Sequence, residues 1–201
     1  MKDIDGLPHD APDALVAIEK ADIAVAEAAG EVVEHPSVKL LGEASEMADQ
    51  PPLVAASLIT LAGGLILRRP AVAAAGLRML AAHAAATGIK AVVKRSVDRT
   101  RPHVLVDEGR YELARGERNE PRYNSFPSGH TAGAVAVAEA IARTLPRAAW
   151  PVRAWAVAIA ALQIPRCAHY PSDVGAGAAI GWAGDRLVRL AERGARAILR
   201  R

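Results

Sequence analysis

The strongest constraint on the fold is a series of alanine-rich apolar segments separated by short charged breaks. Residues 53–67 carry no charge, and residues 71–93 are apolar apart from Arg78, His83 and Lys90. Further alanine-rich stretches cover residues 132–149, 154–164 and 174–184. Alanine favours helices, whereas sheets collect β-branched and aromatic residues, and aromatic residues make up only 3% of this chain. We therefore predict an all-α protein.

The apolar segments leave the choice between a membrane bundle and a soluble bundle open. A membrane span needs roughly 20 apolar residues. Each segment is short or interrupted by that standard, and the mean hydropathy is only +0.11. A soluble helical bundle is therefore an alternative to a multi-pass transmembrane bundle.

Charge placement favours the membrane. We expect about five spans, at approximately 52–68, 71–94, 130–146, 150–166 and 171–187. This arrangement places a set of arginines on one side: Arg68, Arg69, Arg147, Arg153, Arg186, Arg189, Arg193, Arg196, Arg200 and Arg201. By the positive-inside rule that side is cytoplasmic. The acidic N-terminal segment and the motif residues described below then lie together on the opposite side.

We expect a single domain over residues 1–201. Its parts are two amphipathic N-terminal helices within residues 1–50 (12–33 and 37–48), a bundle over 51–187 containing a long polar loop at 95–126, and a basic cytoplasmic tail at 188–201. The first fifteen residues are acidic and lack a continuous apolar core, so no signal peptide is expected. The single cysteine, Cys167, excludes an internal disulfide.

The charge is distributed unevenly along the chain. Residues 1–50 contain twelve acids and three lysines, and the remainder contains 22 lysines and arginines against ten acids. The basic part does not fit a nucleic-acid partner, because stacking aromatics are scarce and no reader motif is present. A phosphate group or an anionic lipid fits such a chain better.

A turn of small residues, Pro127-Ser128-Gly129-His130, directly precedes an alanine-rich helical run. Ser128 is a good N-cap, and Gly129 allows the backbone to come close to a ligand. The free amide groups and the helix dipole would then form an anion-binding site. The alternative interpretation is an ordinary helix cap followed by an exposed histidine.

Two cations precede this turn. Lys94 ends an apolar segment, and six residues separate it from Arg101-Pro102. Arginine binds phosphate oxygens in a fork and lysine binds them as a point charge, so the pair could hold a phosphate from two directions. Alternatively, Lys94 extends to the membrane interface and Arg101 is an ordinary loop charge.

A histidine and an acid follow the turn. Asp173 lies four residues after His169, and Pro171 suits the first turn of a helix. Asp173 would then lie near the imidazole and could hold the tautomer that leaves the other nitrogen free to attack. Incidental placement of a histidine beside a helix-start acid is the alternative.

Two other assemblies use the same residues. Ser128, His169 and Asp173 contain the ingredients of a serine-hydrolase triad, but no strand-flanked G-x-S-x-G is present. A metal site from His130, His169 and Asp173 is disfavoured, because Lys94 and Arg101 would repel a divalent ion. We assign no role to His9, His35, His83 and His103.

The three blocks together resemble the signature of the type 2 phosphatidic acid phosphatase (PAP2) superfamily, and specifically its membrane lipid phosphatase branch. Lys94, Arg101 and Pro102 match Lys-x6-Arg-Pro, and residues 127–130 match Pro-Ser-Gly-His. The third block, Ser-Arg-x5-His-x3-Asp, is matched at His169 and Asp173 only.

The third block departs from the family pattern at its Ser-Arg pair, which falls on Leu162-Gln163. Gln163 lacks the charge that the family's arginine provides to the phosphate. Arg166, three residues before His169, is a candidate replacement.

The resemblance implies roles for the remaining residues. His169 would attack phosphorus and form a phosphohistidine, Asp173 would orient it, and His130 would protonate the leaving oxygen. Lys94, Arg101, Arg166 and the backbone amides at Ser128 and Gly129 would bind the phosphate. No metal or other cofactor is implied.

The resemblance thus implies a phosphatase that acts on a lipid phosphate or diphosphate, such as phosphatidic acid or a polyprenyl (di)phosphate. We expect a multi-pass protein of the cell inner membrane, with its active site on the periplasmic or extracellular face. Its partners would be the substrate and the bilayer, with no nucleic acid and no protein partner. The alternatives are a weakly active or inactive relative that binds lipid phosphates, and a soluble phosphatase of the same superfamily.

Overall fold

The fold was obtained as a computed structural model that describes residues 12–116, 118 and 120–199. The acids of residues 1–11, His9, and the terminal Arg200 and Arg201, which the sequence analysis included, lie outside these residues. The described chain is mostly helical, so the predicted helical class is confirmed.

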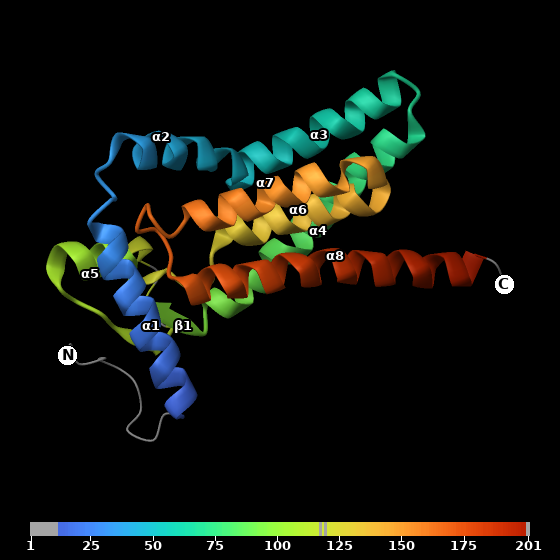
Figure 1. The fold of residues 1–201 in the computed structure, drawn as a ribbon. Helices are drawn as coiled ribbons and strands as arrows, with labels where there is room; N and C mark the ends of the chain where they lie inside the picture. The colour runs from blue at the N-terminus through green and yellow to red at the C-terminus, as the bar shows by residue number, and fades with distance from the viewer. Residues whose placement is uncertain (1–11, 117, 119, 200–201) are drawn as a thin grey trace.

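A bundle of five long helices forms the body of the molecule (Figure 1). These are α3 (Gln50–Ile66), α4 (Pro70–Lys94), α6 (Gly129–Thr144), α7 (Ala149–Leu162) and α8 (Pro171–Leu199). Helices α4, α6 and α8 pack against one another, while α3 lies along α4 and α7 lies along α6. The apolar segments in the sequence therefore correspond to helices, and residues 188–199 continue α8.

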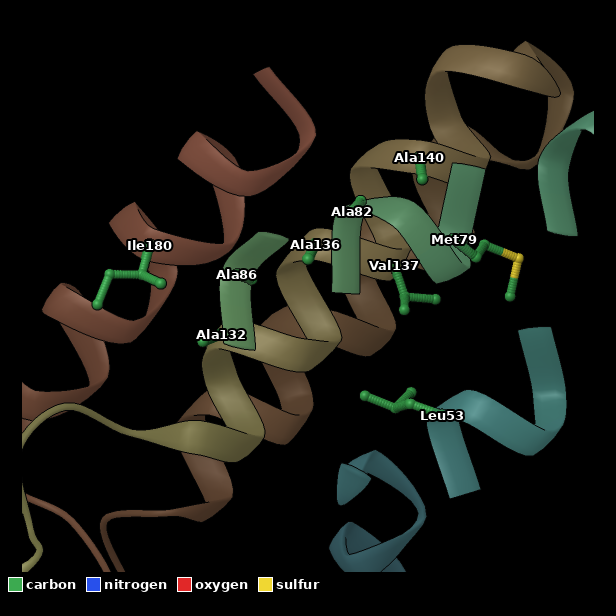
Figure 2. Close-up of a cluster of buried hydrophobic side chains, with 9 residues drawn as sticks. All are labelled: Leu53, Met79, Ala82, Ala86, Ala132, Ala136, Val137, Ala140 and Ile180. Carbon is green, nitrogen blue, oxygen red and sulfur yellow. The ribbon is translucent and has the colours of Figure 1, made fainter. Parts of the chain in front are cut away.

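Small side chains allow the helices of the bundle to approach closely. The central cluster combines alanines, such as Ala82 and Ala136, with the larger Leu53, Met79 and Ile180 (Figure 2). On α8, a Cβ added at Gly181 would lie 2.4 Å from the carbonyl oxygen of Ala132. Such close backbone contacts between helices require small residues, as in membrane helix pairs.

The two N-terminal helices are also present, with slightly different ends. Helix α1 (Asp13–Gly30) packs on the short helix α5 (Pro102–Glu108) and on the start of α8. Helix α2 (Pro36–Ser45) is followed by a 3-10 turn, η1 (Glu46–Ala48), and packs against α7. Both helices lie at the end of the bundle where α6 and α8 begin (Figure 1).

The expected polar loop at 95–126 has more structure than the sequence indicated. Strands β1 (Val97–Arg99) and β2 (Leu113–Arg115) pair antiparallel, with Arg99 opposite Leu113. In the sequence, helix α5 comes between these two strands, and the 3-10 turn η2 (Pro121–Tyr123) follows the second strand. Strands of three residues are too short to show an alternating pattern, so the strictly all-α prediction missed this pair.

Helix length singles out α4 as a membrane-crossing candidate. Among the described residues, only α4 is both long and apolar enough to cross a bilayer, and α3 is apolar but shorter. Helices α6 and α7 contain 16 and 14 residues, which is fewer than a perpendicular span needs. Helix length therefore does not establish the expected five spans.

We predict that Gly181→Ala destabilises the bundle by about 1–3 kcal/mol, because the new methyl group would collide with the backbone of α6. Gly194→Ala, on the same helix with no atom within 4 Å of the added Cβ, is the matched control. It should stabilise the protein by about 1 kcal/mol through helix propensity. Thermal unfolding in detergent measures both, and equal effects of the two variants would contradict the close α6–α8 contact.

Candidate active site

His169 lies in the segment between α7 and α8 and is almost fully buried, with 3% of its surface exposed. Its Nδ1 is 2.7 Å from the carbonyl oxygen of Ser125 and 3.7 Å from a carboxylate oxygen of Asp173. Because a carbonyl only accepts, Nδ1 carries the proton and donates it to Ser125. The lone pair of the neutral ring is therefore on Nε2, and the ring orientation is set by the backbone.

Burial lowers the pKa of His169 below its ordinary value, because the charged imidazolium loses hydration. The hydrogen bond and charge of Asp173 oppose this shift, and the positive charge of Arg101 adds to it. His169 is therefore neutral at pH 7, the state in which Nε2 can act as a nucleophile.

Asp173 stands in the first turn of α8 and is completely buried. Its carboxylate accepts hydrogen bonds from the Ser125 hydroxyl (2.6 Å), the Tyr170 backbone N–H (2.9 Å) and Nη1 of Arg99 (2.6 Å). These donors come from three separate parts of the chain. They compensate for the loss of hydration that a buried carboxylate suffers.

Arg99 is a buried arginine, 1% exposed, that the sequence analysis did not single out. Its Nη2 donates to Glu19 (2.6 Å) and Asp22 (2.7 Å) of α1, while Nη1 donates to Asp173 and, at 2.8 Å, to the Ser172 hydroxyl. Burial disfavours the charge, but the carboxylates of Asp173, Glu19 and Asp22 outweigh it and raise the pKa of Arg99. Arg99 thereby joins the N-terminal helix to the histidine–aspartate pair.

One sequence signal could have revealed this network. Glu19 and Asp22 are three residues apart in the predicted 12–33 helix, so they lie on one face of it. Both are buried in the structure, at 4% and 3% exposure. Buried acids on a helix require a cation, but the sequence contains many arginines and does not say which one supplies it.

The predicted cations Lys94 and Arg101 lie around the same loop as His169. Lys94 Nζ donates to the carbonyl oxygen of Asn124 (3.1 Å), the residue next to the Ser125 carbonyl that holds His169. Arg101 Nε donates to the carbonyl oxygen of Pro121 (3.0 Å). Burial lowers the pKa of Arg101, the charge of Arg166 acts in the same direction, and Asp173 and Glu46 oppose them.

Lys90 is a further cation at this end of the bundle that the sequence analysis did not assign. A Cβ added at Gly129 would lie 3.3 Å from Lys90 Nζ, so this ammonium group lies against the start of α6. Lys90 precedes Lys94 by four residues on α4, and the two therefore share a face of the helix.

The Ser128–Gly129–His130 turn begins α6 as predicted, but its first amide is not free. The Ser128 hydroxyl accepts from the Thr131 backbone N–H at 3.4 Å, which makes Ser128 the N-cap. The Ser128 backbone N–H donates to the carbonyl oxygen of Asp173 (3.0 Å), so it is already used. This contact connects the start of α6 to the start of α8, and it leaves the first-turn amides of Gly129 and His130 for an anion.

Gln163 and Arg166 meet at one serine. Gln163 is fully buried, and its Nε2 donates to the Ile159 carbonyl oxygen (2.9 Å) and lies 3.4 Å from the Ser45 hydroxyl. Arg166 donates to the same hydroxyl (2.6 Å) and to Glu46 (2.5 Å). The arginine therefore lies next to the position where the family's arginine is replaced by Gln163.

His130 is joined to this second group. Its Nε2 lies 3.4 Å from the Glu46 carboxylate, which also binds Arg166. The predicted residues thus form two connected sets at one end of the bundle, where α6 and α8 begin (Figure 1). His169, Asp173 and Lys94 surround the 124–125 loop, while His130 and Arg166 meet at Glu46. The Ser128–Asp173 backbone contact links the two sets. Arg101 also links them electrostatically, because it interacts with Asp173 of the first set and with Arg166 and Glu46 of the second.

Comparison with known proteins shows which family the chain belongs to. The family model of the PAP2 superfamily matches residues 75–195, more than half of the chain. The chain belongs to the PAP2 superfamily. All the motif residues discussed above lie inside the matched segment, whereas Glu19 and Asp22, which hold Arg99, lie before it.

Two individual relatives are informative. A lipid A 1-phosphatase of Rhizobium johnstonii is 36% identical over 90 residues, which are 45% of this chain and 36% of that protein. This chain therefore matches well under two thirds of that relative. The crystal structure of a transmembrane PAP2-type phosphatidylglycerolphosphate phosphatase from Bacillus subtilis superposes with a TM-score of 0.62. The match covers 89% of this chain and 87% of that one at 19% identity, and it shows a shared fold.

We predict that Arg99→Met lowers the free energy of unfolding by about 3–5 kcal/mol, because it leaves buried carboxylates without their cation. Adding Glu19→Gln and Asp22→Asn should restore part of the loss by removing two of the uncompensated charges. Arg153→Ala, which breaks an exposed ion pair with Glu139, is the control and should change little. Similar melting temperatures for Arg99→Met and Arg153→Ala would show that the network does not hold the fold.

Proposed function

We propose that this PAP2 protein is a phosphatase that transfers a phosphoryl group from a lipid phosphate to His169 and then to water. One observation carries the proposal. The Ser125 carbonyl oxygen accepts the Nδ1 proton of a buried, neutral His169, and this leaves Nε2 as the nucleophilic atom. Cations from separate parts of the chain accompany it.

The reaction has two steps. In the first, Nε2 of His169 forms a bond to phosphorus while the bond from phosphorus to the ester oxygen breaks. His130 gives its proton to that oxygen, which leaves as an alcohol. In the second step His130 takes a proton from water, the water oxygen bonds to phosphorus, and the P–N bond breaks to release phosphate. Asp173 stabilises the positive charge that develops on His169.

Charge on the transferred group is balanced by protein cations. Lys94, Arg101 and Arg166 supply positive charge, with Lys90 beside the start of α6, and the amides of Gly129 and His130 add hydrogen bonds. Each well-placed donor in comparable oxyanion sites is worth roughly 2.7–4 kcal/mol of barrier. Because these cations would repel a divalent ion, we propose a metal-independent reaction.

The proposed substrate is a lipid phosphate or diphosphate monoester, such as phosphatidic acid or a polyprenyl (di)phosphate. The activities for which the two relatives are named, on lipid A and on phosphatidylglycerolphosphate, support this class. We further propose that α3, α4, α6, α7 and α8 lie in the inner membrane. The arginines at the far end of α8 would then be cytoplasmic and the His169 site would be on the opposite face.

One observation favours a second function, a weakened relative that binds lipid phosphates without turnover. Gln163 lacks the family arginine's charge, and its buried Oε1 has no hydrogen-bond partner among the described residues. The position of Arg166 supports activity instead. Its guanidinium and the Gln163 side chain both contact the Ser45 hydroxyl, so Arg166 can supply positive charge close to the position of the missing arginine.

Phosphate release from phosphatidic acid and from a polyprenyl diphosphate, measured in detergent with EDTA, tests the proposal. We expect turnover that EDTA does not abolish. His169→Ala should lower the turnover rate by about 10³-fold or more, as the removal of a nucleophile does in other enzymes. The wild type should carry an acid-labile phosphoryl group. Arg147→Ala, on an exposed residue far from the site, is the control. Activity that requires added metal, or that survives His169→Ala, would contradict the mechanism. An inert wild type that gains activity in Gln163→Arg would favour the binding function.

The pH profile provides an independent check. Protonation removes the Nε2 lone pair, so kcat/KM should fall as the pH drops through the lowered pKa of His169, below the ordinary value of 6.5. Asp173→Asn removes a charge that raises this pKa and should shift the acidic limb to lower pH. Arg101→Met removes a charge that lowers it and should shift the limb to higher pH. NMR titration of the imidazole can replace kinetics in slow variants, and shifts in the same direction for both variants would contradict the assignment.

A further inference from the structure

A second basic cluster lies at the end of the bundle opposite to His169. It consists of Arg78 on α4, Arg143 on α6, and Arg189, Arg193 and Arg196 on α8. Together with Glu192 these residues line a pocket of about 270 Å³. The cluster lies where the charged half of α8 extends beyond the bundle (Figure 1), and nothing in the reaction proposed above uses it.

Two of the arginines are held in place by carboxylates. Arg143 donates to Asp185 (2.8 Å) and to Glu192 (2.9 Å). Arg78 donates to the other oxygen of Glu192 (2.7 Å) and to the Thr144 hydroxyl (3.2 Å). Both arginines are largely buried, with side chains 20% and 17% exposed for Arg78 and Arg143. The network therefore holds both arginines in place, and both carboxylate oxygens of Glu192 are already used.

The remaining three arginines have no such partners. Arg189, Arg193 and Arg196 follow the spacing i, i+4, i+7 and therefore share one face of α8. Within residues 12–116, 118 and 120–199, none of the three forms an ion pair. The cluster holds five arginines against Glu192 and Asp185, an excess of three positive charges by formal count. Cations gathered in this way repel one another unless an anion lies between them.

We propose that this pocket is a phosphate-binding site, separate from the catalytic one. The guanidinium groups of Arg189 and Arg193 bind the anionic oxygens directly. Arg78 and Arg143 contribute positive charge at the base of the pocket. A phosphate group suits the site because guanidinium forks bind its oxygens in pairs. The group belongs either to an anionic lipid headgroup or to a free phosphate anion. Basic pockets between helices on the cytoplasmic side of a membrane are suited to lipid headgroups.

The test compares the wild-type protein with Arg189→Ala plus Arg193→Ala, a variant that leaves the Arg78–Arg143–Glu192 network intact. Its matched control is Arg69→Ala plus Arg147→Ala, which removes two exposed arginines from the same end of the bundle without touching the pocket. One arm titrates inorganic phosphate by calorimetry. A second arm uses nanodiscs of phosphatidylcholine with or without phosphatidylglycerol, and native mass spectrometry counts the lipids that stay bound.

We expect the wild type and the Arg69→Ala, Arg147→Ala control to bind phosphate at one site more than the Arg189→Ala, Arg193→Ala variant, or to retain a phosphatidylglycerol that this variant loses. The affinity of this variant for the phosphate group should fall by roughly tenfold or more. Loss in the first arm identifies a free anion, and loss only in the second identifies a lipid. Turnover of a short-chain phosphate ester should be unchanged in both variants, which separates this site from His169. Equal binding by the two variants in both arms would overturn the proposal, whatever the protein's activity.

Discussion

The structure of the His169 site depends on one buried ion cluster, the Arg99 guanidinium among Glu19, Asp22 and Asp173. Each of these groups would be strongly destabilising if buried alone, and each becomes tolerable only with the others present. Because the partners come from α1, β1 and α8, the cluster forms only when those elements have docked. It therefore ties the position of Asp173 to the folding of a helix at the far end of the sequence.

Asp173 then organises the residues around it. Its carboxylate takes hydrogen bonds from Ser125 and Tyr170, and its backbone carbonyl takes the Ser128 N–H. Ser125 in turn holds His169 through its carbonyl oxygen. His169, the proposed nucleophile, and the first turn of α6 are thus placed by the same residue. A rigid scaffold of this kind supports preorganised electrostatics, in which donors and charges need not rearrange during the reaction.

The bundle contributes close helix contacts rather than large apolar side chains. Its core is formed largely by alanines, and Gly181 lies where the α8 backbone meets that of α6. Both helices begin at the end that holds the proposed active site, so their close contact fixes the distance between the His169 segment and the Ser128 turn. At the other end the same helices, together with α4, carry the arginines of the second cluster. The two ends of the molecule therefore differ in chemistry although they share a core.

Local patterns in the sequence were sufficient for the helices, the N-cap at Ser128 and the identity of the motif residues, since these depend on periodicity and on short spacings. The alanine-rich segments correspond to α3, α4, α6, α7 and α8, although α8 continues through the predicted tail to Leu199, and the family prediction is confirmed. Local patterns did not reveal four features of the site. These are the role of Arg99, the hydrogen bond from the Ser128 amide to Asp173, the position of Lys90 and the contact of Arg166 and Gln163 with the same serine. Each involves residues that are distant in the chain, and a charge finds its partner only after helices from both ends have packed. Tertiary structure therefore decided which of the many arginines is buried, which is paired and which remains available to a phosphate.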